Sequence, residues 1–208
     1  MSGYNTSDQE QIQMLKDWWK KYGPTILTGL LVFFIANFSW SFWRNYQQRY
    51  TGEASLLYTR MLSALQQQKS DEVQMFGNYL LKDYKRTPYA SLAGLLLAKA
   101  AVDQQKLDLA LTQLQAVINT SSTATLKQIA KIRAARVLLA LHKNPEALDL
   151  LRKIDDQSFL AEVLETRGDI WLAQEKKTEA IAAYQDALLH STEVQSPLLK
   201  MKLERLSK

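Results

Sequence analysis

Residues 165–189 read ETRGDIWLAQEKKTEAIAAYQDALL, and their spacing of small and aromatic residues predicts helical repeats. These residues match a 34-residue tetratricopeptide unit at Gly168, Trp171, Ala180, Tyr184 and Ala187. Packing explains the spacing, because small residues let the two helices of a unit approach closely and the aromatic residue seats the second helix against the next unit. The stretch therefore predicts an antiparallel helix pair within a repeat array.

Two upstream segments fit the same template more loosely. The matching positions hold Ala135, Leu138, Ala147, Leu151 and Ile154 in one segment, and Ala98, Ala101, Ala110, Leu114 and Val117 in the other. Turn-forming residues lie between the expected helices, at 104–106, 119–122, 143–145, 155–158 and 175–177. The alternative is that any amphipathic hairpin places alanines near these positions, and three units in phase favour a repeat array.

The regions around these units also predict helices. Residues 53–68 and 71–84 read as two helices that do not match the template well, and Gly52 is expected to break the helix before them. Pro197 is expected to begin a capping helix over residues 198–206. Because no segment alternates β-branched residues, the predicted fold is all-α, with a single N-terminal transmembrane helix before a tetratricopeptide-like α-solenoid of antiparallel helix pairs.

The transmembrane prediction rests on residues 25–43, TILTGLLVFFIANFSWSFW, which carry no charge. As a helix this stretch extends about 28 Å, close to the hydrocarbon thickness of a bilayer, and Trp and Tyr residues flank it on both sides. A buried core helix is one alternative, but such helices rarely run this long uncharged. A cleaved signal peptide is another, but the stretch ends in WSFWR, a poor cleavage site. An uncleaved signal anchor fits best.

The flanks of this helix suggest its orientation. Lys16, Lys20 and Lys21 precede it and Arg44 and Arg49 follow it, a difference that decides little alone. Long domains translocate largely regardless of charge, so the C-terminal part is expected outside the cytoplasm. The predicted organisation is a cytoplasmic stub (1–23), a transmembrane helix (24–43) and a periplasmic tetratricopeptide-like domain (44–208), in a single-pass protein of the cell inner membrane.

The stub has an amphipathic pattern of its own. Ile12, Leu15, Trp19 and Tyr22 fall on one helical face. The favoured interpretation is an interfacial helix on anionic lipid, before Gly23-Pro24 turns the chain into the membrane. The alternative is a docking helix for a cytoplasmic partner.

Two sets of residues are candidates for contacts with other proteins. Small residues and an amide form a candidate contact surface on the membrane helix, at Thr25, Gly29, Ala36 and Asn37. The first helices of the repeats supply a candidate partner-binding groove, at Leu92, Leu95, Lys99, Ile129, Ile132, Arg136, Glu165 and Asp169. The alternative for the groove is that the preceding helices pack inside the short array and bury its apolar members.

Composition and motifs give no support for an enzyme. The net charge of +5 comes from interspersed residues, so no nucleic-acid interface is predicted. The chain has no cysteine, and its two histidines, His142 and His190, lie far apart near predicted helix ends. No phosphate-binding loop, dinucleotide fingerprint or nucleophile elbow occurs. We therefore predict no catalytic residue, no cofactor, no metal site and no small-molecule substrate.

The order of several short motifs resembles the YfgM family, the ancillary subunit of the bacterial SecYEG translocon. The motifs are Trp18-Trp19, Gly23, the membrane helix with its Trp43-Arg44 exit, YASLA at 89–93 and IRAARV at 132–137. The resemblance spans essentially the whole chain. It implies an inner-membrane protein with a periplasmic tetratricopeptide domain, and partners that include the SecYEG translocon, a PpiD-like periplasmic chaperone and unfolded or emerging proteins.

Two further hypotheses stay open. The chain is either an adaptor of an envelope complex unrelated to export, or, as the family resemblance implies for its cytoplasmic side, a stress-response regulator that acts through the stub. The leading hypothesis remains a membrane-anchored scaffold of the chaperone network at the translocon.

Overall fold

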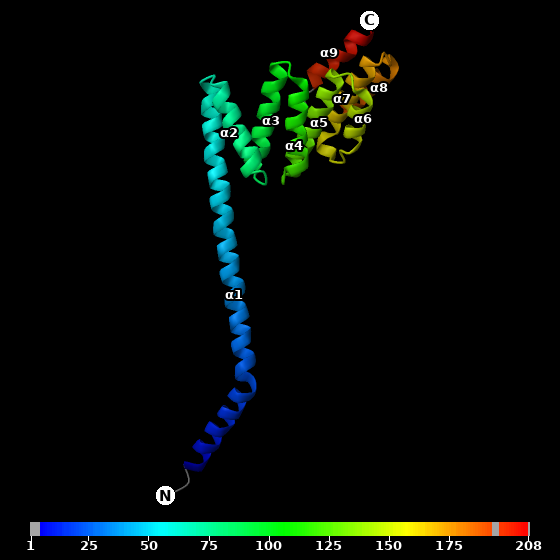
Figure 1. Ribbon diagram of the computed structural model, residues 1–208. Helices are drawn as coiled ribbons and strands as arrows, with labels where there is room; N and C mark the ends of the chain where they lie inside the picture. The colour runs from blue at the N-terminus through cyan, green and yellow to red at the C-terminus, as the bar shows by residue number, and fades with distance from the viewer. Residues whose placement is uncertain (1–4, 193–195, 208) are drawn as a thin grey trace. The chain divides into compact units, whose positions relative to one another are not determined.

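The computed structural model describes residues 5–192 and 196–207, whose regular structure is entirely helical. The elements are α1 (Asn5–Gln66), α2 (Ser70–Asp83), α3 (Pro88–Asp103), α4 (Leu107–Thr120), α5 (Ala124–Ala140), α6 (Asn144–Arg152), a short 3-10 turn η1 (Gln157–Phe159), α7 (Leu160–Ala173), α8 (Lys177–Leu189) and α9 (Ser196–Ser207) (Figure 1). The chain divides into two compact units, Met1–Tyr50 and Thr51–Lys208. The predicted all-α fold is confirmed for the described residues.

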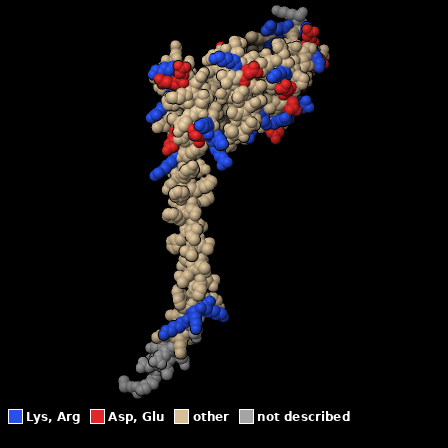
Figure 2. All heavy atoms as spheres, in the orientation of Figure 1, with Lys and Arg blue, Asp and Glu red and all other residues tan. Residues whose placement is uncertain are grey.

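The first unit contains the apolar part of α1, whose side chains have almost no protein around them. Leu31, Phe34 and Phe38 are 59, 65 and 77% exposed. In the described part of the chain, α1 is the one helix long and apolar enough to cross a membrane, judged by length and composition. Figure 2 shows this stretch without charged side chains, and basic side chains gather at one end of it.

The structure treats two expected features of α1 differently. The turn expected at Gly23-Pro24 is a bend within a continuous helix (Figure 1). The break expected at Gly52 is wrong, because α1 runs on to Gln66. A helical glycine costs only about 1 kcal/mol, and the turns after Gly52 are fixed by burial of Ala54 and Met61.

Four helix hairpins in the second unit share one turn geometry. The turn residue has a φ of 57 to 62° in each, at Gln68, Gln105, His142 and Glu175. The N–H of Gln105 donates to the carbonyl of Val102 (2.9 Å), and the next N–H, of Lys106, donates to that of Ala101 (2.8 Å), with equivalent bonds in the other three turns. This Schellman motif satisfies the last carbonyls of a helix. The turns therefore mark four repeats, one more than the spacing of alanines predicted.

The additional repeat consists of the end of α1 and of α2. Its template positions hold the buried residues Met61, Ala64, Val73, Gly77 and Leu80. The region therefore packs as a repeat although its residue types do not match the template well. The alignment on alanines missed this repeat because the large and the small residue have changed places between its two helices. Here the large Met61 is on the first helix and packs against Gly77 on the second. In the last repeat the small Gly168 is on the first helix and packs against Tyr184 on the second.

The three predicted repeats are confirmed by their packing. Their template alanines are buried, including Ala98, Ala135 and Ala180. A Cβ on Gly168 would lie 2.5 Å from Cε1 of Tyr184, so the absence of a side chain there lets the aromatic ring pack against α7. The capping helix is also present, because α9 packs the buried Leu199 against α8.

The turn at His142 provides a test of the repeat geometry. A residue other than glycine is sterically strained at positive φ. His142→Gly should therefore raise the free energy of unfolding by about 0.5–1 kcal/mol. The matched control is His190→Gly, because His190 follows α8 with a φ of −106° and gains nothing from glycine. Thermal denaturation of both variants checks this. A loss of stability in His142→Gly would contradict the observed turn.

Candidate partner-binding site

The predicted groove residues come from the first helices of three repeats, α3, α5 and α7, and the structure divides them into buried and exposed members. Leu95 and Ile132 are only 6 and 5% exposed. Leu95 packs in a core cluster with Ala98 and Ala134, and Ile132 belongs to a neighbouring cluster. These two residues therefore stabilise the stack of helices and do not present their side chains to a partner.

The partly exposed apolar members occupy the edges of the same contacts. Leu92 is half-buried on α3, and Ile129 packs against the cluster around Leu95. The burial of Leu95 and Ile132 thus comes from packing among α3 to α7.

The basic members lie beside a hollow of about 370 Å³ between α3, α4 and α5. Val102, Leu107, Leu114 and Val137 are among its apolar lining residues. Its charged lining residues are Lys99, Arg133 and Arg136, and we call it the basic-rimmed hollow. Lys99 and Arg136 were predicted from the repeat template, whereas Arg133 was missed because it lies outside the template positions.

The acidic members, Glu165 and Asp169, are held by a lysine of the capping helix. The Lys202 Nζ lies 2.7 Å from Oε1 of Glu165, and 2.7 and 3.0 Å from the two carboxylate oxygens of Asp169. Arg136 approaches the other oxygen of Glu165 at 3.5 Å. The Tyr184 hydroxyl also donates to Asp169, and burial together with this bond raises the pKa of Tyr184. The acidic end of the predicted groove is therefore occupied by α9.

This ionic cluster predicts a measurable contribution from Lys202. Replacing it with alanine leaves the buried Glu165 and the partly buried Asp169 without their shared cation, so we expect the free energy of unfolding to fall by about 1–3 kcal/mol. Lys200→Ala, on the exposed side of the same helix, is the control and should change stability by less than about 0.5 kcal/mol. Equal effects in urea denaturation would show that the cluster contributes nothing specific.

The candidate contact residues of the membrane helix are all exposed along α1. Thr25, Gly29 and Ala36 lie on one side of the helix, and Asn37 lies about 100° further around it. A Cβ on Gly29 would meet no atom within 4 Å. This side therefore offers a smooth surface for another helix, and its role as a contact surface remains a prediction.

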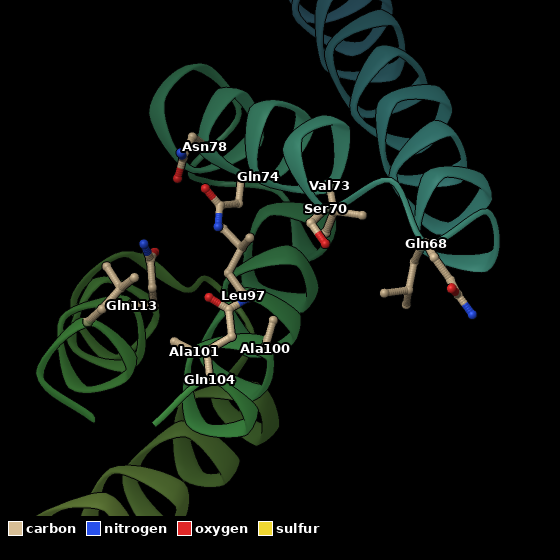
Figure 3. A pocket seen from close by; sticks show the side chains of 12 residues that line it. Gln68, Ser70, Val73, Gln74, Asn78, Leu97, Ala100, Ala101, Gln104 and Gln113 are labelled. Carbon is tan, nitrogen blue, oxygen red and sulfur yellow. The ribbon is translucent and has the colours of Figure 1, made fainter. Parts of the chain in front are cut away.

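A second hollow of about 150 Å³ lies between the end of α1 and helices α2, α3 and α4 (Figure 3). Its lining is uncharged and combines apolar side chains, among them Leu97, with five amides, Gln68, Gln74, Asn78, Gln104 and Gln113. No motif in the sequence predicted this hollow, because glutamines on exposed helix faces are common in soluble domains.

The two histidines occupy the helix ends expected for them. His142 forms the turn after α5, and Nδ1 of His190 lies 2.9 Å from the carbonyl oxygen of Asp186. Within residues 5–192 and 196–207, no three His, Cys, Asp or Glu side chains are grouped as metal ligands.

Curated relatives match this chain over nearly its whole length. A chain from Haemophilus influenzae is 28% identical over 203 residues, covering 98% of this chain and 99% of the relative. Relatives from Escherichia coli and Neisseria gonorrhoeae are 27 and 26% identical over 202 residues, each covering 97% of the relative, and 97 and 96% of this chain. All three are named "Ancillary SecYEG translocon subunit", a name that describes no enzyme. The resemblance found in the sequence motifs is therefore confirmed.

A family model described as a tetratricopeptide repeat-like domain matches residues 16–208. The match includes the end of α1 and α2, where the structure shows the additional repeat. It extends through α9, which packs on the last repeat. The chain therefore belongs to the tetratricopeptide repeat-like domain family.

Proposed function

We propose that this protein is a membrane-anchored scaffold that associates with the SecYEG translocon. The observation that carries the proposal is the similarity of nearly the whole chain to relatives that all bear the name of an ancillary subunit of that translocon. A fragmentary match to the repeats alone would not support it, because helical repeats serve many unrelated partners.

The anchor in this proposal is the apolar part of α1. Its exposed aromatic and aliphatic side chains are unfavourable in water and require lipid or protein around them. We propose a single span with a cytoplasmic N-terminus and a periplasmic repeat domain in the inner membrane. The basic residues before the span and the length of the domain after it support this orientation.

The repeat domain is the proposed binding module for polypeptides. Stacked helical repeats present extended surfaces, and the basic-rimmed hollow lies among the positions predicted to face a partner. A PpiD-like periplasmic chaperone and proteins emerging from the translocon are the proposed partners, as the family resemblance implies.

Purification of the full chain from native membranes in mild detergent tests this function. We expect SecYEG subunits to co-purify with a C-terminally tagged chain. The matched control keeps residues 44–208 and replaces the span with an unrelated apolar helix of equal length. Recovery of a different envelope complex, with no translocon subunit, would favour the adaptor hypothesis and contradict the proposal.

A further inference from the structure

The basic-rimmed hollow combines an apolar interior with three cations, and two of these have carboxylate partners. The Nζ of Lys99 lies 2.6 Å from Oδ2 of Asp103, and Nη2 of Arg136 lies 3.5 Å from Oε2 of Glu165. Arg133 is exposed and makes no hydrogen bond or ion pair with any residue that the structure describes. One cation at the hollow is therefore unbalanced.

The two carboxylates neutralise the rim only in part. Lys99 and Asp103 are 67 and 60% exposed, and a pair this accessible to water is weak and easily exchanged. Lys202 lies 2.7 Å from both Glu165 and Asp169, so Lys202 and Arg136 together balance these two carboxylates, and the unbalanced charge of the rim comes from Arg133. The rim therefore has a net positive charge that favours a carboxylate from another molecule.

The interior of the hollow, unlike its charged rim, favours an apolar group. Its volume of about 370 Å³ and its aliphatic walls, which include Val102 and Leu107, accommodate a large aliphatic or aromatic side chain. Three cations around a single apolar hollow do not form the continuous stripe that a nucleic-acid backbone requires. The combination fits a side chain with acidic neighbours on the same polypeptide.

We propose that the basic-rimmed hollow binds a polypeptide segment in which one bulky apolar side chain is flanked by carboxylates. The apolar side chain enters the hollow, and the carboxylates pair with Arg133 and its two neighbouring cations. This inference deepens the proposed function and rests on the repeat domain being its polypeptide-binding module. It specifies the segments that such a module selects.

Fluorescence anisotropy with labelled ten-residue peptides tests this, using the full chain in a non-ionic detergent. The peptides place one phenylalanine between two pairs of aspartates, asparagines or lysines in a Gly/Ser background. We expect the aspartate peptide to bind at least about tenfold more tightly than the asparagine peptide at low ionic strength, with salt reducing the difference. The lysine peptide should bind most weakly.

Two variants locate the binding. Arg133→Gln should weaken the aspartate peptide about fivefold or more and leave the asparagine peptide unchanged, because only the charge contact is lost. Ala140→Phe fills the hollow from an exposed position and should weaken both peptides. The controls Arg152→Gln and Ala124→Phe alter exposed residues that do not line the hollow and should change neither affinity.

The outcomes separate this inference from the proposed function. Equal affinity for the aspartate and asparagine peptides, binding of no peptide, or no effect of Arg133→Gln would each overturn the specificity proposed here. Co-purification with the translocon would remain as the independent test of the scaffold role. Loss of that co-purification would overturn the proposed function even where the peptides bind as expected.

Discussion

Replacing Tyr184 with alanine is expected to lower the free energy of unfolding by about 3–5 kcal/mol, the cost of removing a large buried side chain. The ring is fully buried and packs against Gly168, where no Cβ separates it from α7. Its hydroxyl donates to Asp169 at 2.7 Å. The substitution therefore removes both the packing between α7 and α8 and one partner of the ionic cluster beneath α9.

Two further variants divide this loss into its parts. Tyr184→Phe keeps the ring and should cost about 1 kcal/mol, because Asp169 retains its contact with Lys202. Leu189→Ala, on the same helix but 80% exposed, should change stability by less than about 0.5 kcal/mol. Urea denaturation followed by limited proteolysis measures the free energy of unfolding of the three variants. A loss below 1 kcal/mol for Tyr184→Ala would contradict the packing of the last repeat.

The second large effect concerns the apolar part of α1. Leu31→Arg places a charge near the middle of the stretch, which disfavours membrane insertion by about 3–4 kcal/mol relative to leucine. If this stretch is the anchor, the variant should move from the membrane fraction to the soluble fraction or be degraded. Fractionation of cells with alkaline extraction measures this.

The control places the same charge at the edge of the stretch. Asn45→Arg lies next to Arg44, where a long basic side chain reaches the interface, and should remain in the membrane fraction. Retention of both variants to the same extent would contradict anchoring by α1.

Much of the fold was predictable because packing restricts residue size at fixed positions. Gly168 and Tyr184 identified the last repeat, and the alanines at 98 and 135 extended the pattern upstream. The repeat containing Met61 and Gly77 was not predicted. Its first helix has the large residue and its second helix the small one, which preserves the packed volume but changes the sequence pattern that defines a repeat. The turns gave no glycine signal, since their positive φ positions hold Gln, His and Glu.

The candidate site was less predictable, because the position of a residue in the repeat template does not specify whether neighbouring repeats bury its side chain or leave it exposed. Leu95 and Ile132 were expected on a binding surface, but contacts between repeats bury them. Glu165 and Asp169 were expected to be available, but Lys202 reaches them from a helix more than thirty residues away in sequence. Such long-range ion pairs have no local sequence signature.

Photocrosslinking in native membranes can detect an association of α1 with the translocon. A probe at Ala36 lies on the side with Thr25 and Gly29, whereas a probe at Phe38 lies at similar depth about 160° around the helix. We predict SecYEG adducts from position 36 and far fewer from position 38. Absence of translocon adducts from both positions, with the chain inserted normally, would show that α1 does not contact the translocon.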